Sequence, residues 1–183
     1  MADITVLVPH EQGLEAIASV PGVRPVAYAP HDLLPMGAEV LITPFLSWPG
    51  AVALAASLPE LRLVQLLSAG AESWVGKLPE HVALSDCRGA HGGATAEWVV
   101  SGLLGVYRHL PQFVHAQRDG RWDYHQTEEL AGKKVLVVGA GDVAEHIVRR
   151  LTAFDVETTL VARTPRPPVH GIDEVLDLLP HHD

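Results

Sequence analysis

The feature that most constrains the fold is the stretch VLVVGAGDVA, residues 135–144, in which an apolar run ends in a glycine turn. The apolar run is typical of a buried strand, and the residues after the turn have the period of a helix that extends to about Phe154. A second strand-like run follows at 157–162. A strand, a glycine turn, a helix and a further strand together predict a βαβ unit with parallel strands.

This turn has the spacing of a dinucleotide-binding fingerprint, with alanine in the third position. Gly139 permits the tight turn, Gly141 lets backbone N–H groups approach a diphosphate, and Ala144 is small enough for the helix to pack on the strand. The free N–H groups at the helix start would then bind the anion. The alternative is an ordinary strand-to-helix turn that uses glycine for steric reasons alone. The residues predicted to contact the dinucleotide here are Gly139, Ala140, Gly141, Asp142 and Val143.

Asp142 fits this prediction least well. A carboxylate in the first helical turn would repel a phosphate if its side chain faced the turn. The alternative is that Asp142 caps the helix, which is a common position for aspartate.

The residues after the second strand-like run indicate which nicotinamide cofactor, NAD or NADP, would bind. An acidic residue there accepts a hydrogen bond from the ribose 2′-hydroxyl of NAD, whereas arginine accommodates the 2′-phosphate of NADP. This chain has Arg163, Thr164 and Arg166, close to the usual spacing of about 20 residues from the turn. We therefore predict NADP as the cofactor, with NAD as the second choice. The alternative is that these residues are solvated loop charges.

The first part of the chain predicts a separate α/β domain. Strand-like and helix-like runs alternate there, as in a small doubly wound, flavodoxin-like sheet. The predicted strands are 4–8, 23–28, 39–43, 61–67 and 82–85, and the predicted helices are 11–19 and 49–58. The predicted organisation is a flavodoxin-like domain at 1–92, a helix and connection at 93–130, and the first part of an NAD(P)-binding Rossmann domain at 131–183.

A long helix is predicted between these domains, from about Thr95 to Leu110, where Pro111 ends it. Its two glycines, Gly102 and Gly105, each cost about 1 kcal/mol relative to alanine. We expect another element to approach the backbone closely there as compensation. The helix is predicted to bury a stripe made of Val99, Leu103, Val106 and Leu110, and 111–131 is predicted to be a surface connection.

Composition excludes several classes of partner. The formal net charge of −9 argues against nucleic acid or an anionic membrane, and the apolar runs are too short or too broken by glycine to span a bilayer. Cys87 is the single cysteine, which favours a reducing compartment, and the first residues lack the features of a signal peptide. We therefore predict a cytoplasmic protein. The 11 histidines are scattered without a ligand pattern, so no metal site is predicted.

Several stretches of the chain resemble the D-isomer-specific 2-hydroxyacid dehydrogenases, including their glyoxylate/hydroxypyruvate reductase-like members. The resemblance covers about Leu61 to Asp183, and the earlier sheet agrees in pattern only. Glu72 stands where the family usually has aspartate, and Phe154-Asp155 stands where it usually has Phe-Gly. The stretches are LLSAGAE at 66–72, RGAH at 88–91 with TAE at 95–97 and Arg108, GRW at 120–122 with ELAGK at 129–133, and the glycine turn.

This resemblance implies hydride transfer between a nicotinamide and a small 2-keto or 2-hydroxy acid, in a cleft between two domains. It implies that backbone N–H groups of Ala69 and Gly70 hold the substrate carboxylate, which agrees with the exposed donors that glycine leaves at a strand end. The alternative is a tight turn that needs Gly70 for its dihedral angles. Glu97 is assigned a structural role near the helix start, and a homodimer is implied for the full-length protein.

The resemblance also implies that the second sheet is incomplete in this chain. The family's catalytic arginine, acidic residue and histidine lie beyond the last strand that 131–183 can hold, so no catalytic residue is predicted here. We expect the 183-residue chain alone to be inactive. Two other interpretations stay open: a non-catalytic dinucleotide sensor or interaction module of the same fold, and a flavodoxin-like binding domain with an incidental glycine turn.

Overall fold

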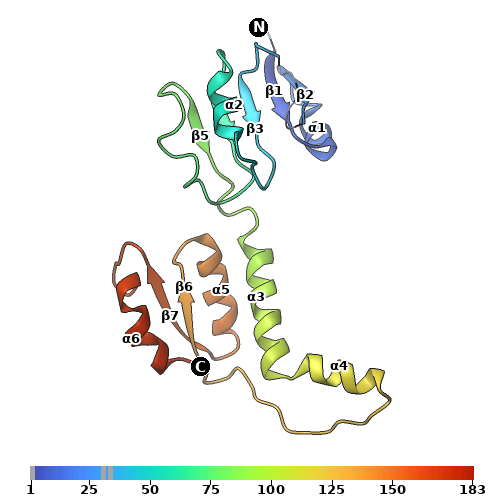
Figure 1. The fold of residues 1–183 in the computed structure, drawn as a ribbon, viewed down its shortest axis with the longest axis vertical. Helices are drawn as coiled ribbons and strands as arrows, with labels where there is room; N and C mark the ends of the chain where they lie inside the picture. The colour runs from blue at the N-terminus through green and yellow to red at the C-terminus, as the bar shows by residue number, and fades with distance from the viewer. Residues whose placement is uncertain (1–2, 30–31, 33–34) are drawn as a thin grey trace. The chain divides into compact units, whose positions relative to one another are not determined.

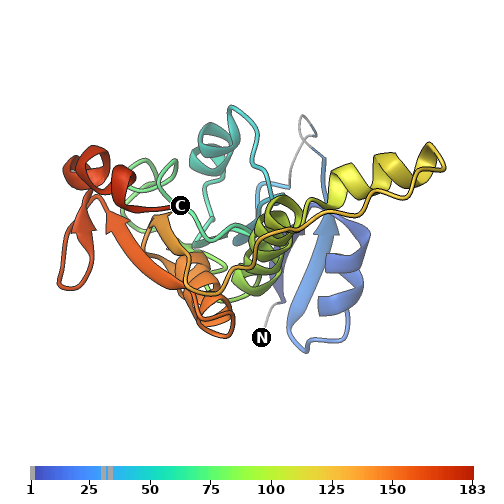
Figure 2. The same cartoon turned by 90° about the horizontal axis from the view of Figure 1, so that it is seen from below.

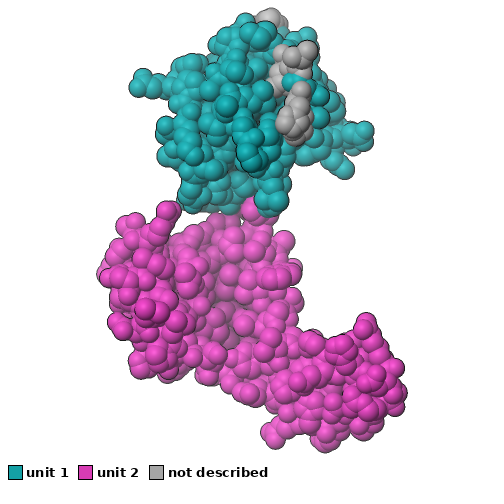
Figure 3. Space-filling model, in the orientation of Figure 1, with its two compact units in different colours: residues 1–88 teal, residues 89–183 magenta. Residues whose placement is uncertain are grey.

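The computed structural model describes residues 3–29, 32 and 35–183 (Figure 1). The chain divides into two compact units, residues 1–88 and residues 89–183, which Figure 3 shows in different colours. Each unit has its own parallel sheet and its own hydrophobic core.

Unit 1 is built on a parallel sheet with the strand order β2-β1-β3-β4-β5. This order is that of flavodoxin-like sheets, so the predicted fold class is confirmed for the first part of the chain. All the predicted strands form, although most are shorter than their sequence patterns. The elements are β1 (Ile4–Val8), α1 (Glu11–Ile17), β2 (Val23–Ala27), β3 (Val40–Ile42), α2 (Ala51–Ser57), β4 (Leu63–Gln65) and β5 (Ala83–Ser85).

The core of unit 1 lies between this sheet and its helices. Leu7, Leu41 and Val64 come from three neighbouring strands and are fully buried. The buried Tyr28 hydroxyl donates to the Ile42 carbonyl at 2.7 Å, and burial raises the pKa of Tyr28. The loop after β4, residues 66–71, begins at the carboxyl edge of this parallel sheet.

Unit 2 contains the parallel sheet β6-β7-β8 with helices before, between and after its strands. The predicted βαβ unit is confirmed, and a short third strand, β8, extends it beside β7 although the sequence did not indicate one. Residues 172–181, after β8, form a series of short helical turns. The elements are α3 (Gly92–Tyr107), α4 (Leu110–Arg118), β6 (Lys134–Val138), α5 (Asp142–Thr152), β7 (Glu157–Ala162), β8 (His170–Gly171), η1 (Ile172–Glu174), α6 (Val175–Leu178) and η2 (Leu179–His181).

The core of unit 2 forms where α3 packs against α5 (Figure 1). Ala96 and Val100 of α3 are buried with Ile147 and Leu151 of α5. The predicted stripe of α3 is correct only in part, because Val99 and Leu103 pack on this core whereas Val106 and Leu110 are exposed.

The expectation for the two glycines of α3 is wrong. No described atom lies within 4 Å of a Cβ built on Gly102 or Gly105 within this chain. There is therefore free space beside the helix at these positions, and nothing in the described chain compensates for their low helix propensity.

The segment predicted as a surface connection is in part helical. Pro111 does not end α3; it lies in the first turn of α4, where its missing N–H costs nothing. The break between the helices is at His109, whose φ of 51° lies in the left-handed region. Residues 119–128 then run back alongside α4 (Figures 1 and 2), and His109 Nδ1 lies 2.9 Å from His125 Nε2.

Candidate functional site

The candidate site is the turn between β6 and α5 in unit 2. Gly139 follows the last residue of β6 with a φ of 124°, a conformation that residues with a side chain rarely adopt. Its N–H donates to the Val161 carbonyl of β7 at 2.8 Å. The turn is therefore tied to the neighbouring strand at the point where the chain leaves the sheet.

The first turn of α5 offers backbone donors. Gly141 is the N-cap residue, in an extended conformation (φ −99°, ψ −166°), and no side chain caps the helix. The first N–H groups of a helix have no acceptor within the helix, and they carry a partial positive charge. An anion at this turn would meet several donors at once, which is the chemistry that a diphosphate needs.

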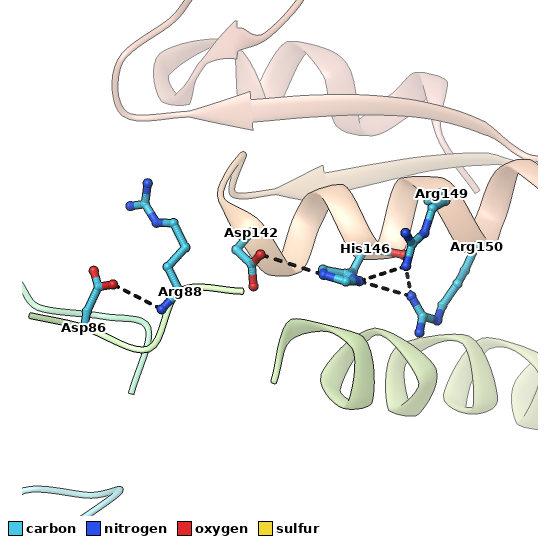
Figure 4. Close-up of polar contacts among 6 residues, drawn as sticks. All are labelled: Asp86, Arg88, Asp142, His146, Arg149 and Arg150. Atoms are coloured by element: carbon cyan, nitrogen blue, oxygen red, sulfur yellow. Dashed lines mark hydrogen bonds and ion pairs between the residues drawn. The ribbon is translucent and has the colours of Figure 1, made fainter. Parts of the chain in front are cut away.

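Asp142 is the first residue of α5, and its side chain lies against α3. The predicted capping role is wrong, because Gly141 occupies the cap position. The Asp142 side chain is only 14% exposed, and its Oδ1 lies 3.8 Å from His146 Nε2 one helical turn further on. In Figure 4 the carboxylate lies beside His146. Its Oδ2 is buried, with no hydrogen-bond partner in the described part of the chain.

A polar network continues from His146 along the α3–α5 contact (Figure 4). Arg149 Nη2 lies 3.2 Å and Arg150 Nη1 lies 3.4 Å from His146 Nδ1, which acts as acceptor because arginine only donates. Arg150 Nη2 also donates to Glu97 Oε1 of α3 at 2.8 Å. Glu97 therefore takes part in the helix contact, and such a solvent-exposed pair contributes about 1 kcal/mol at most.

The loop between β7 and β8 carries the residues predicted to select the cofactor. Arg163, Thr164 and Arg166 are all exposed in this loop. Arg166 Nη2 donates to the Ala140 carbonyl at 3.1 Å. The structure thus brings Arg166 to the glycine turn, although 26 positions separate the two residues.

The predicted substrate loop of unit 1 follows β4. Ser68 Oγ donates to the Gly70 carbonyl at 3.0 Å, and the Ser68 carbonyl accepts from the Cys87 N–H at 2.9 Å. Gly70 does not have a positive φ, so the alternative that its dihedral angles require glycine is wrong. A Cβ on Gly70 would lie 2.9 Å from Glu72 Oε2, so the space beside Gly70 is taken by the Glu72 carboxylate.

Two residues that the sequence did not single out, Gly92 and His146, contribute to the neighbourhood of the turn. Gly92 begins α3 and is buried, and a Cβ there would clash with Asp142 Oδ2 and lie 2.9 Å from His146 Cδ2. No local pattern reveals this contact, because α3 and α5 are far apart in the sequence.

Over residues 3–29, 32 and 35–183, no three His, Cys, Asp or Glu side chains are grouped so as to hold a metal ion. None of the helices in the same ranges is both long and apolar enough to cross a bilayer.

Residues 100–180 match the sequence model described as the NAD binding domain of D-isomer specific 2-hydroxyacid dehydrogenases. The chain is 32% identical over 123 residues to the glyoxylate reductase/hydroxypyruvate reductase of Mus musculus, and the match covers 58% of this chain and 35% of that protein. The resemblance predicted from the sequence is thus confirmed.

Solved structures share the fold. The crystal structure of a D-isomer specific 2-hydroxyacid dehydrogenase family protein from Aeromonas salmonicida has a TM-score of 0.78 and 24% identity, over 100% of this chain and 62% of that one. A D-isomer specific 2-hydroxyacid dehydrogenase from Xanthobacter autotrophicus, crystallised with NADPH and MES, has a TM-score of 0.74 and 23% identity, over 98% of this chain and 61% of that one. The chain thus spans a little over three fifths of the length of these two proteins and about a third of the length of the mouse protein.

Proposed function

We propose, from the similarity of this chain to the D-isomer-specific 2-hydroxyacid dehydrogenases, that it binds NADP(H) through unit 2 as part of an oxidoreductase. That enzyme would transfer a hydride between the nicotinamide and a small 2-keto or 2-hydroxy acid. The observation that carries the proposal is the strand–glycine turn–helix of β6 and α5, with Arg166 hydrogen-bonded to the turn.

The glycine turn would bind the diphosphate. The N–H groups of Gly141, Asp142 and Val143 lie at the N-terminus of α5, and Gly139 and Ala140 shape the turn that leads to them. The Asp142 carboxylate lies against α3, so its negative charge does not face this position directly. In this proposal only the backbone of Asp142 contacts the cofactor.

The loop after β7 would bind the adenosine end. Arginine presents paired donors that match a phosphate, and Thr164 adds a hydroxyl. Arg163 and Arg166 are both exposed in this loop, within reach of solvent and of a ligand. This composition favours the 2′-phosphate of NADP over the 2′-hydroxyl of NAD.

The substrate would be held by the backbone of Ala69 and Gly70, whose loop lies at the carboxyl edge of the unit 1 sheet. Backbone N–H groups of such loops are suited to a carboxylate, and the exposed Glu72 side chain, whose carboxylate lies beside Gly70, would turn away from the bound substrate. We assign no residue of this chain to proton transfer or to activation of the keto group. The 183-residue chain alone is accordingly proposed to be inactive.

We expect the chain to bind NADPH about tenfold more tightly than NADH, because a 2′-phosphate adds charge-assisted hydrogen bonds. Arg163→Gln should lower NADPH affinity about tenfold and lower NADH affinity much less. Isothermal titration calorimetry with both cofactors measures this. Arg121→Gln, an exposed arginine paired with Asp119 after α4, is the matched control and should change neither value. Equal affinities for both cofactors would contradict the NADP preference, and failure to bind either would contradict the proposed function.

We also propose that the protein forms a homodimer through the outer face of α3. Trp98 is 76% exposed and Val106 is 70% exposed on this helix, and Gly102 and Gly105 leave space beside them. Large apolar side chains gathered on one face are typical of an interface. Trp122, after α4, is 92% exposed and adds to the apolar surface of unit 2.

Trp98→Glu should therefore weaken dimerisation at least tenfold, because it places a charge at the centre of the proposed interface. Sedimentation velocity over a range of concentrations measures the shift from dimer to monomer. Leu176→Glu is the control. Leu176 is 78% exposed, about as much as Trp98, but it belongs to α6 and not to the proposed interface on α3. A chain that sediments as a monomer at high concentration would refute the proposal.

A further inference from the structure

The loop between β7 and β8 has a second contact with the candidate site that cofactor selection does not require. Arg166 donates to the Ala140 carbonyl, in the middle of the glycine turn. A residue that served only the 2′-phosphate would need no contact with the peptide that shapes the diphosphate site. The hydrogen bond between Arg166 and Ala140 therefore points to a role of Arg166 in the structure of the glycine turn.

The backbone of Arg166 is held in place. Its N–H donates to the Val169 carbonyl at 3.1 Å, and the Val169 N–H donates back to the Arg166 carbonyl at 2.5 Å. Val169 is buried, and β8 begins at the next residue and pairs with β7 at Val161 and Ala162. Arg166 is thus carried on a short closed turn that is anchored to the sheet.

The other end of β8 is also anchored. Glu174 Oε1 accepts from the Gly171 N–H at 2.7 Å, and Glu174 Oε2 lies 2.8 Å from His170 Nδ1. The hydrogen bond from Gly171 and, to a smaller extent, the contact with His170 lower the pKa of Glu174. The strand β8 is therefore stabilised at both ends, together with the turn at 166–169 that precedes it. The Arg166 guanidinium group extends from this turn to the glycine turn.

The glycine turn consequently makes two hydrogen bonds to β7 and to the loop that follows β7. The Gly139 N–H binds the Val161 carbonyl, and the Ala140 carbonyl binds Arg166. Gly-Ala-Gly has unusual backbone freedom, and ordering it costs conformational entropy. Two ties on consecutive residues restrict this freedom before any ligand binds.

We propose that Arg166 is a positioning residue, which holds the glycine turn ready for the diphosphate whether or not the ligand carries a 2′-phosphate. This inference rests on the proposed function. A donor on the Ala140 carbonyl offsets the negative end of that peptide dipole, which would otherwise oppose an anion bound at the adjacent N–H groups. Arginine has five N–H donors, so one bond to the carbonyl leaves others for the adenosine phosphate.

The test uses ADP-ribose, which contains the diphosphate but no 2′-phosphate, and the chain without any ligand. Arg166→Gln should weaken ADP-ribose binding about tenfold in calorimetry and should speed hydrogen exchange at residues 139–143 in the free chain. Arg166→Lys, which keeps the charge and a donor, should restore part of both. Arg121→Gln removes the same charge elsewhere on the surface of unit 2 and should change neither readout.

The two readouts separate this inference from the proposed function. If Arg166→Gln leaves both exchange and ADP-ribose affinity unchanged, the positioning role is wrong even though NADPH binds. If only NADPH affinity falls, Arg166 serves the 2′-phosphate alone, which also overturns the inference. If the unmutated chain binds no nucleotide, the proposed function fails, and exchange in the free chain still decides whether Arg166 holds the turn.

Discussion

Replacement of Gly141 by valine is expected to reduce NADPH affinity at least 100-fold while unit 2 stays folded. The backbone of Gly141 is extended, with a φ of −99° that any residue adopts, and no described atom lies within 4 Å of a Cβ built there. The fold therefore has room for the new side chain, and the less favourable N-cap costs about 1 kcal/mol. The isopropyl group would instead occupy the space beside the first N–H groups of α5. Each hydrogen bond to a charged group that is lost costs about 1.5–3 kcal/mol, so losing two accounts for the expected effect.

Calorimetry with NADPH and thermal unfolding of the same samples measure the two halves of this prediction. Gly37→Val is the control, because Gly37 lies in unit 1 and a Cβ there makes only an ordinary contact, 3.8 Å from Glu60. Gly139→Val gives the contrasting case: its φ of 124° strains any side chain, so we expect a stability loss of about 1–3 kcal/mol as well as lost binding. Unchanged NADPH affinity in Gly141→Val would show that the diphosphate does not lie at this turn.

Replacement of Gly92 by valine is expected to destabilise unit 2 by about 2–3 kcal/mol, in the upper part of the range for overpacked sites. Gly92 is buried at the start of α3, where a side chain would meet the Asp142 carboxylate and the His146 ring. Both partners belong to α5 and have little room to withdraw, because α3 and α5 form the core of the unit. Relieving the clash would shift the two helices apart.

A double-mutant cycle tests the cause of this loss. Asp142→Ala removes the carboxylate that the Gly92 side chain would meet first, so Gly92→Val should cost at least 1 kcal/mol less in that background. Hydrogen exchange at the amides of α3 and α5 is the measurement, because it reports on unit 2 alone. An equal cost in both backgrounds would mean that the clash with Asp142 does not limit the packing.

The glycine turn and the strands around it could be predicted because their signals are local. An apolar run such as 135–138 needs burial wherever it lies, and Gly139 marks the place where the backbone takes a positive φ. The strand order of unit 1 was likewise anticipated, since short alternating strands and helices allow few arrangements. The spacing from the turn likewise singled out Arg163, Thr164 and Arg166 as candidates for the adenosine end of the cofactor, but not the contact of Arg166 with the turn.

The helix α4 and the strand β8 were not predicted, because their sequence signals are ambiguous or weak. Pro111 normally ends a helix, but it also fits the first turn of one, and the left-handed conformation of His109 has no sequence marker of the kind that glycine provides. The strand β8 is only His170–Gly171 and exists because β7 offers it a partner. The burial of Val106 was misjudged for a related reason: a helical stripe shows which face is apolar but not how far along the helix a partner extends.

By itself, the sequence determined where the glycine turn and all the strands and helices except α4 and β8 lie, because φ/ψ preference and apolar periodicity act over a few neighbouring residues. Only the tertiary structure decided that the Asp142 carboxylate turns to α3, that Gly92 has no room for a side chain, and that Arg166 binds the Ala140 carbonyl. These contacts join segments about 25 to 50 residues apart, and each depends on the direction in which a side chain leaves its helix or loop once the elements have packed. Sequence periodicity predicts on which face of a helix or strand a residue lies, whereas the packing of elements decides which residue it contacts.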